Sequence, residues 1–278
     1  IRRRIISVKP APQFSGTIRH AELCSILYFQ KGRLGPLGKE RLDKILASQN
    51  LGSRKECGLL IRRGEVAVNG VIVKKPDAKA DPEVDILTVK GGEIRFRRHI
   101  YLMLNKPQGV LSASRDPHAP TVIDLLPEKL RRRGLFPAGR LDKDTEGLLI
   151  ITDDGDLAHR MLAPKSHVYK LYHAVVDAPV TQEDIDAFAQ GLSLDDMVCL
   201  PAGLGVLEDG PQPLVWVKIR EGKFHQVKRM FLARGKTVLR LKRVQMGGLP
   251  LDPALAPGES RELTEDELKL IFNLANLY

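Results

Sequence analysis

The chain has 278 residues, of which 43% are hydrophobic, and a formal net charge of +10 at pH 7. This length and apolar fraction favour one large domain or two domains with ordinary packed cores, and the positive charge points to a polyanionic partner. Three cysteines without a Cys-x-x-Cys pair argue against a disulfide framework or a zinc ribbon, and no apolar run is long enough to span a membrane.

The positive charge is concentrated toward the N-terminal end. Residues 1–39 carry eight Lys or Arg against one Glu, residues 40–98 carry 13 against nine, and residues 99–278 carry 23 against 24. The first part is compatible with a transit peptide or a basic RNA-binding arm, but its lack of a sustained hydrophobic period favours a disordered extension. We expect three parts with these boundaries, in a cytoplasmic protein unless residues 1–39 direct it to an organelle.

Two helices are predicted at the start of the second part. Leu42, Ile45 and Leu46 recur at helical spacing. Ser53, with Glu56 three residues later, is the pattern of a capping box at the start of the next helix.

Strands follow these helices. Residues 66–68 and 71–73 are predicted to pair through Asn69-Gly70, because this dipeptide tolerates the positive φ of a type I′ turn. A further strand is expected at 85–89, and residues 91–98 are the expected linker.

The third part mixes strands and helices without a regular βαβ repeat. A half-buried strand at 100–104 and a short helical turn at 122–126 come first. Further strands are expected at 168–176, 214–219 and around 238–241, and helices at 156–162, 181–188, 223–234 and from 264 to near the C-terminus. In the 223–234 helix, Phe224, Val227, Met230 and Phe231 form the expected apolar stripe. The fold class predicted is α+β, with a small N-terminal domain and a larger domain built on a mainly antiparallel sheet.

The most unusual stretch is residues 139–155, where a charged loop between glycines runs into an apolar strand. A carboxylate on a loop that a buried strand fixes is a common way to hold a reactive group, although a solvated surface turn has the same pattern. Asp142, Asp144 and Glu146 also match early positions of a calcium loop, but position twelve is Asp153 rather than Glu. Three later acids, at 153, 154 and 156, allow a metal-dependent nuclease, but a structural Asp-Gly turn before a helix is favoured because no His or Glu triad accompanies them.

Four blocks resemble RNA pseudouridine synthases of the ribosomal small subunit pseudouridine synthase A family. They are residues 104–110 (LNKPQGV), the loop and strand at 139–155, residues 170–175 (KLYHAV) and residues 221–230 (EGKFHQVKRM). They occur in the family's order, and the resemblance runs from about residue 41 to the end. The two helices and the hairpin that precede these blocks resemble the S4 RNA-binding domain.

The resemblance implies a reaction and the residues that perform it. Asp142 would be the catalytic carboxylate, and Lys228 the cation that keeps it ionised in a dry pocket, where burial alone would raise a carboxyl pKa. Tyr172 would stack on the target uracil and accept its proton, and Arg140 would fill the space of the extruded base. Phosphate contacts in the S4-like domain would come from Arg54, Lys55, Arg62 and Arg63.

The expected activity is therefore isomerisation of a specific uridine in ribosomal RNA, most consistent with 16S rRNA, without a cofactor or a metal ion. The partner is this RNA, free or in a partly assembled small subunit, and the protein is expected to be a monomer away from membranes. Two alternatives remain open at this point: a non-catalytic ribosome-binding or assembly factor, and a large-subunit 23S rRNA synthase of the same family.

Overall fold

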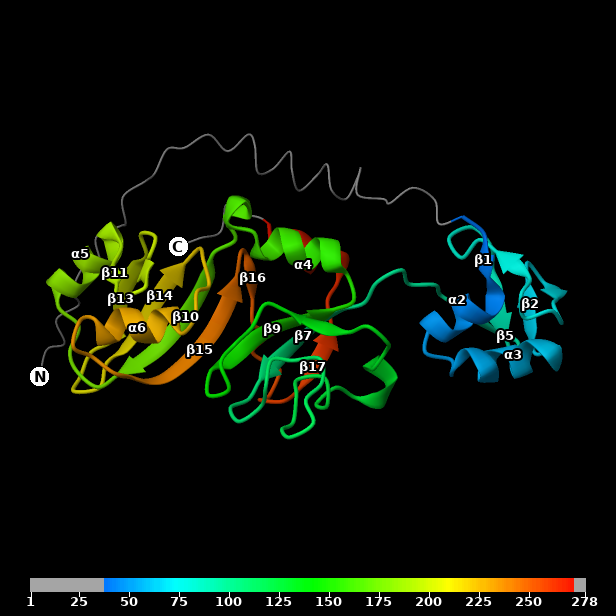
Figure 1. Ribbon diagram of the computed structural model, residues 1–278, viewed down its shortest axis with the longest axis horizontal. Helices are drawn as coiled ribbons and strands as arrows, with labels where there is room; N and C mark the ends of the chain where they lie inside the picture. Colours follow the sequence, from blue (N-terminus) through cyan, green and yellow to red (C-terminus); the bar gives the residue numbers. More distant parts are fainter. Residues whose placement is uncertain (1–37, 273–278) are drawn as a thin grey trace, which may run out of the picture.

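A computed structural model describes residues 38–272 as a small unit and a larger one joined by an extended segment (Figure 1). The predictions for the N-terminal extension lie almost entirely outside the described residues, as does the end of the expected C-terminal helix. Within the described part, no helix is long and apolar enough to cross a membrane.

The small unit is built as the sequence predicts. Its helices are α2 (Leu42–Ser48) and α3 (Arg54–Arg62), and the Ser53–Glu56 capping box is present at the start of α3. A four-stranded sheet has the order β3-β2-β5-β6, from β2 (Val66–Val68), β3 (Val71–Ile72), β5 (Leu87–Val89) and β6 (Gly92–Ile94), and β1 (Glu40–Arg41) pairs with β4 (Lys79–Ala80). Asn69 and Gly70 have φ values of 52° and 79°, as the predicted hairpin turn requires.

The linker is shorter than the sequence suggested. Residues 92–94, predicted to be part of it, pair with β5 as β6. Lys90 and Gly91 make the turn with φ values of 51° and 80°, so two residues in the left-handed region continue the sheet into the segment expected to be the linker.

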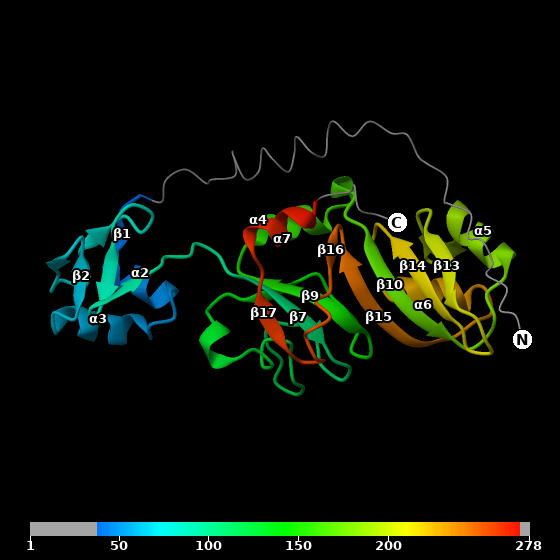
Figure 2. The ribbon, with the colours of Figure 1, turned by 180° about the vertical axis from the view of Figure 1, so that it is seen from behind.

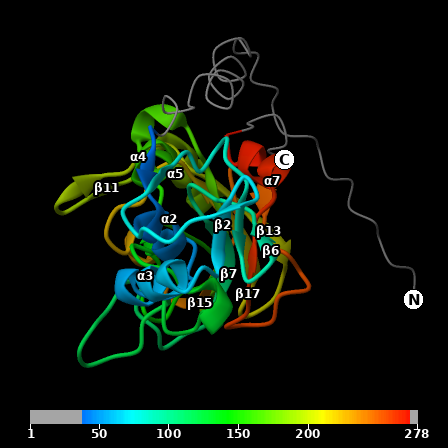
Figure 3. The ribbon, with the colours of Figure 1, turned by 90° about the vertical axis from the view of Figure 1, so that its right-hand side faces the viewer.

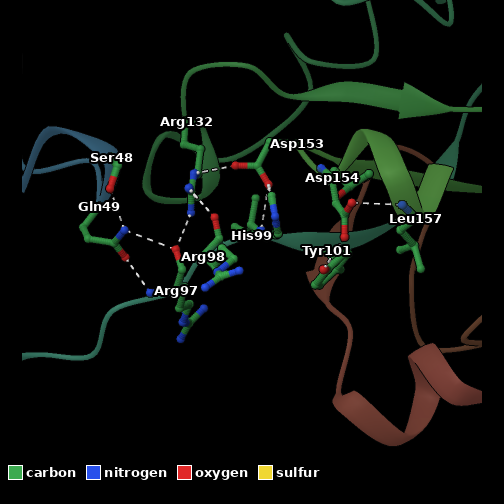
Figure 4. Close-up of polar contacts among 12 residues, drawn as sticks. Ser48, Gln49, Arg97, Arg98, His99, Tyr101, Arg132, Asp153, Asp154 and Leu157 are labelled. Carbon is green, nitrogen blue, oxygen red and sulfur yellow. Dashed lines mark hydrogen bonds and ion pairs between the residues drawn. The ribbon is translucent and has the colours of Figure 1, made fainter. Parts of the chain in front are cut away.

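Polar contacts hold the linker against both units (Figure 4). Gln49 at the end of α2 accepts a hydrogen bond from the backbone N–H of Arg97 at 2.9 Å and donates to its carbonyl at 3.2 Å. From the larger unit, Arg132 donates to the carbonyl oxygens of Arg97 and Arg98 and forms an ion pair with Asp153 at 2.9 Å. Arg132 therefore serves a structural contact within the protein.

The larger unit is organised on a mainly antiparallel sheet with the order β13-β14-β10-β15-β9-β7-β17, with β16 beside β15 and β8 beside β9. The strands are β7 (Tyr101–Lys106), β8 (Phe136–Ala138), β9 (Glu146–Thr152), β10 (Lys170–Val176), β13 (Gly203–Glu208), β14 (Leu214–Ile219), β15 (Val238–Met246), β16 (Leu249–Pro250) and β17 (Ser260–Glu262). Only β9 and β15 pair in parallel among the strands of this sheet within residues 38–272. The predicted α+β class is confirmed.

Helices cover the two faces of the sheet unequally. On the front face, α5 (Gln182–Gln190) and α6 (Gln226–Leu232) pack against Tyr172, Ala174 and Leu241 in the main hydrophobic core. On the back face, α4 (Gly155–Leu162) and α7 (Glu265–Leu270) cover the β9–β7 half of the sheet. Figure 2, from behind, shows β15, β10 and β14 in front of α6 and beyond the cover of α4 and α7.

Several smaller elements differ from the predictions or extend them. The strand at 100–104, expected to be half-buried, is buried on both sides in β7, because α4 and α7 pack on one face and the turns and loops of residues 110–141 pack on the other. Residues 122–126 form turns rather than a helix, and short 3₁₀ turns follow at η1 (Glu128–Leu130) and η2 (Pro164–Ser166). A hairpin of β11 (Ser193–Leu194) and β12 (Met197–Val198) projects to one side in the end-on view of Figure 3.

The helix predicted at 223–234 begins later, at Gln226. His225 has a φ of 49°, outside the helical region, so the first turn cannot start before it. Phe224, expected in the apolar stripe, is instead 74% exposed, whereas Val227, Met230 and Phe231 are buried as predicted.

Asp184 provides a test of the packing of α5. Its side chain is 1% exposed and forms ion pairs with Lys236 at 2.7 Å and Arg234 at 2.9 Å. Burial by itself raises the pKa of this carboxyl, but hydrogen bonds from Lys236, Thr181 and Arg234 outweigh it and lower the pKa to about 2.

Because the folded-state pKa lies below the ordinary value of 3.8, this stabilisation of about 2 kcal/mol is present above pH 4 and is lost as the pH falls toward 2. We expect Asp184→Asn to destabilise the protein at pH 7, with the difference from wild type shrinking in acid; urea unfolding at several pH values measures it. Asp186→Asn, at an exposed acid of the same helix, is the control. An equal effect of both variants, or a difference independent of pH, would contradict the assignment.

Candidate active site

The loop before β9 is held from beneath by a buried lysine. Lys106, at the end of β7, is 0% exposed. Its ammonium donates to the carbonyl oxygens of Pro107 at 3.0 Å, Asp142 at 3.0 Å, Lys143 at 3.3 Å and Thr145 at 2.9 Å. Burial lowers the pKa of this ammonium to about 8, against the opposing effect of nearby carboxylates. The lysine thus supplies the charge around which the loop folds.

This arrangement does not match the calcium alternative. The loop carbonyl groups converge on an ammonium rather than leaving a cavity for an ion. Asp153, which would be the twelfth ligand, lies beyond the far end of β9 and pairs with Arg132. Asp154 caps α4 by accepting from the Leu157 N–H at 2.9 Å, so the expected structural turn before a helix is confirmed.

Further hydrogen bonds fix the position of Asp142. The Thr145 N–H donates to the Asp142 carbonyl at 3.0 Å, and the Gly109 N–H donates to the Lys143 carbonyl at 2.8 Å. The Ser112 hydroxyl donates to the Leu141 carbonyl at 2.8 Å and accepts from the Leu141 N–H at 3.1 Å. The backbone of the loop is therefore tied on both sides, while the Asp142 side chain remains 29% exposed.

Lys228 lies on α6, which packs on the front face of the sheet, and its side chain reaches the Asp142 carboxylate. Its ammonium lies 3.3 Å from Asp142 Oδ2 and 2.6 Å from Asp144 Oδ1. The hydrogen bond from Lys228 lowers the pKa of the Asp144 carboxyl, against burial. One cation therefore faces two carboxylates, of which Asp144 is the more exposed and the more tightly paired.

Two features of this cluster were not predicted. His225 Nε2 lies 3.6 Å from Asp142 Oδ1, and its ring stacks on Phe224 with centroids 3.9 Å apart and planes 17° apart. No role was expected for His225, and Asp144 was considered only as a calcium ligand. Both residues lie in blocks that carry the family resemblance, and this membership was the signal in the sequence that could have identified them.

α6 is positioned by the projecting hairpin. Arg229, which the sequence predicted to face away from Asp142, pairs with Asp196 in the turn between β11 and β12. Lys223 donates to the Val198 carbonyl of the same hairpin. These contacts anchor the helix that carries Lys228.

Tyr172 and Arg140 complete the cluster. Tyr172, on β10, is 7% exposed and lines a hollow together with Asp142, Leu241 and Ile219, while exposed Arg140 contributes to the same lining. The hollow thus has an apolar wall with an aromatic ring, and a charged side with a carboxylate, an imidazole and a guanidinium. This composition suits a planar polar ring more than a purely apolar ligand.

The four basic residues expected to contact RNA lie in the small unit, away from this cluster (Figure 1). Arg54 donates to both carboxylate oxygens of Asp43 at 3.1 Å, so part of its guanidinium is used in packing α3 against α2. Lys55, Arg62 and Arg63 are exposed on α3 and just after it.

Comparisons with known proteins give a consistent result. Residues 100–233 match the family described as RNA pseudouridylate synthase, and residues 40–86 match the S4 domain. An uncharacterized RNA pseudouridine synthase of Bacillus subtilis, YtzG, is 47% identical over 83% of this chain and 98% of its own. Ribosomal small subunit pseudouridine synthase A of Escherichia coli is 43% identical over 82% of this chain and 98% of its own. A crystal structure of a pseudouridylate synthase aligns with a TM-score of 0.57 at 35% identity, covering 84% of this chain and 99% of its own.

Lys106 offers a test of the loop that does not depend on any activity. Lys106→Met keeps the length of the side chain but leaves four carbonyl groups without their donor. We expect a loss of about 2–4 kcal/mol in unfolding free energy and faster amide exchange at Thr145 and Gly109. Lys143→Met, at an exposed lysine of the same loop, should change neither. Unchanged exchange in Lys106→Met would show that the loop holds its shape without the ammonium.

Proposed function

The chain belongs to the family of RNA pseudouridine synthases, which are isomerases, and we propose that it converts a specific uridine of ribosomal RNA to pseudouridine with Asp142 as its catalytic carboxylate. The observation that carries this assignment is that Asp142 and Tyr172 line one hollow, with Lys228 paired to Asp142. They come from a loop, a helix and a strand that are far apart in the sequence.

The reaction breaks the glycosidic bond to N1 of uracil, turns the base, and joins its C5 to the same sugar carbon. A proton leaves C5 and N1 gains one, so the atoms balance without an oxidant or a second substrate. A carboxylate can attack a carbon of the nucleotide and leave again, which suits a reversible covalent step. Asp142 must be anionic to do so, and the Lys228 ammonium at 3.3 Å favours the anion when a bound base excludes water.

Tyr172 and Arg140 have complementary roles in this proposal. The Tyr172 ring forms a floor on which the uracil stacks, and its phenol oxygen accepts the C5 proton after giving up its own, which offsets the proton that N1 gains. Exposed Arg140 at the rim fills the space that the extruded base vacates, and its planar guanidinium offsets part of the few kcal/mol that unstacking costs.

We propose that residues 40–98 dock the RNA and residues 99–278 carry out the reaction. The S4 domain match supports RNA binding by the small unit. Exposed Lys55, Arg62 and Arg63, with part of Arg54, are the groups we assign to the phosphates. Such contacts set affinity and register and carry little sequence information.

Small-subunit 16S rRNA is the proposed substrate, free or in a partly assembled subunit. Support comes from the Escherichia coli relative, which is named for the ribosomal small subunit and aligns over 98% of its length. We further propose that the protein acts as a monomer in the cytoplasm.

The substrate and the nucleophile are tested together. Purified protein is incubated with 16S and 23S rRNA, separately and in partly assembled subunits, and pseudouridine is mapped chemically. We expect one new site in 16S rRNA and no product with Asp142→Asn, which keeps the size of the side chain but cannot attack. Modification of 23S rRNA would reassign the substrate, binding without modification would favour an assembly factor, and full activity of Asp142→Asn would remove the proposed nucleophile.

The role of Lys228 is tested by substitutions that remove or keep its positive charge. Lys228→Ala leaves the Asp142 and Asp144 carboxylates without their shared cation, so we expect kcat to fall by about 100-fold or more. Lys228→Arg keeps the charge and should stay within about tenfold of wild type. Arg229→Ala, one residue along and paired with Asp196, is the control. A loss in Lys228→Ala no larger than in Arg229→Ala would exclude the electrostatic role.

A further inference from the structure

The back face of the large sheet carries an ordered row of side chains that the proposed reaction does not use. Register places Gly205 of β13 opposite Trp216 of β14, Trp216 opposite His173 of β10, and His173 opposite Lys242 of β15. Cross-strand partners point to the same side of a sheet. An indole, an imidazole and an ammonium therefore lie side by side on neighbouring strands.

This row is separate from the active site. Tyr172, Ala174 and Leu241 alternate with His173 and Lys242 along the same strands and face the front core. Ligands on the two faces are therefore separated by the thickness of the sheet.

The indole of Trp216 packs flat against the backbone of two glycines in β13. A methyl group built on Gly203 would approach the indole to 2.7 Å, and one on Gly205 would come closer still to the indole nitrogen, so only glycine lets the ring rest on β13. The indole is half-buried and belongs to neither hydrophobic core of the larger unit. One side of the ring is thus used for packing on backbone, which leaves the other side as an aromatic platform.

Basic groups and a hollow lie beside this platform. His173, Val175, Leu214, Arg240 and Lys242 line a hollow of about 220 Å³ between β10, β14 and β15. Burial and the neighbouring Lys242 lower the pKa of His173, so a neutral imidazole that can donate and accept hydrogen bonds faces this hollow. On the next row, Lys218 pairs in register with Leu171, and its ammonium lies 4.9 Å from the centre of the Tyr169 ring.

The acids nearby reduce this positive charge only in part. Glu146 Oε2 accepts from Arg240 Nε at 2.8 Å, and Glu208 lies in register with Leu214 at the edge of the sheet. Glu146 also lies in register with Lys242, but within residues 38–272 neither Lys242 nor Lys218, on the rows that hold Trp216 and Leu171, forms an ion pair. A flat aromatic platform flanked by cations is the arrangement with which proteins hold single-stranded nucleic acid.

We propose that this back face is a second RNA-docking surface, on which an unpaired base stacks on Trp216 while Lys242 and Arg240 hold the adjoining phosphates. The inference takes from the proposed function only that the partner is RNA, and it concerns another face of the sheet. A second copy of the chain would bring the same basic face, and the N-terminal 39 residues carry eight basic groups against one acid, so neither is complementary in charge.

The chain offers a direct reporter, because Trp216 is its single tryptophan. Base stacking on an indole quenches its emission. The full-length protein is titrated with a single-stranded 12-nucleotide RNA of mixed sequence at several salt concentrations. We expect saturable quenching of Trp216, about tenfold weaker apparent affinity in a Lys242→Gln/Arg240→Gln double variant, and a shallower salt dependence in that variant.

Lys129→Gln, at an exposed lysine in η1 outside this face, is the matched control and should bind like wild type. RNA binding that leaves Trp216 emission unchanged would overturn the proposal, as would quenching equal in the double variant and wild type. Equal quenching by poly-glutamate would assign the face to an acidic protein instead. The titration is repeated with the Asp142→Asn variant. Quenching of Trp216 then tests the docking surface without catalysis, so the docking proposal and the proposed function can be rejected independently.

Discussion

The charge of one buried lysine organises the active-site loop. The Lys106 ammonium replaces its lost hydration with four backbone carbonyl groups, three of which belong to the loop that carries Asp142. A buried ammonium is costly unless it is fully hydrogen-bonded, and this requirement selects one loop conformation. Rigidity of the proposed nucleophile is thus obtained from the backbone, and the Asp142 carboxylate itself stays outside that network and partly exposed.

The sheet places the other residues of the site, Tyr172 and Lys228, beside the loop that carries Asp142. Parallel pairing of β9 with β15 needs a close approach at Gly147, where a side chain would meet the backbone of Arg243. This approach joins the half of the sheet with β7 and β9 to the half with β10 and β14. Asp142 comes from the first half and Tyr172 from the second, and α6 extends from the second half to place Lys228 between two carboxylates.

Local signals in the sequence predicted the local structure well. The capping box at Ser53 and the Asn-Gly turn depend on a few neighbouring residues, and both are present as predicted. The predicted start of α6 was wrong, because His225 adopts a left-handed backbone conformation that interrupts an otherwise helical pattern. The burial of β7 could not be predicted, because it depends on how α4, α7 and residues 110–141 fold back over the two faces of the sheet.

The composition of the site was predictable only through the motifs of a family. Spacing alone does not show that Lys228 lies beside Asp144, 84 residues away, and Lys106 gives no sign in the sequence of the carbonyl groups that surround it. The stacking of His225 on Phe224 beside the Asp142 carboxylate could not be predicted either, because it depends on backbone conformation. Likewise, the row of Trp216, His173 and Lys242 exists only once strand register is known.

The central claim is that Asp142, fixed by the loop, faces a uridine held on Tyr172. A crystal structure with RNA carrying an unreactive analogue at the target uridine tests it most directly. The account predicts the uracil ring stacked on Tyr172, with a carbon of the nucleotide within about 3.5 Å of the Asp142 carboxylate and Lys228 still beside it. A target nucleotide bound elsewhere, or turned so that the carboxylate contacts no carbon of it, would contradict the account.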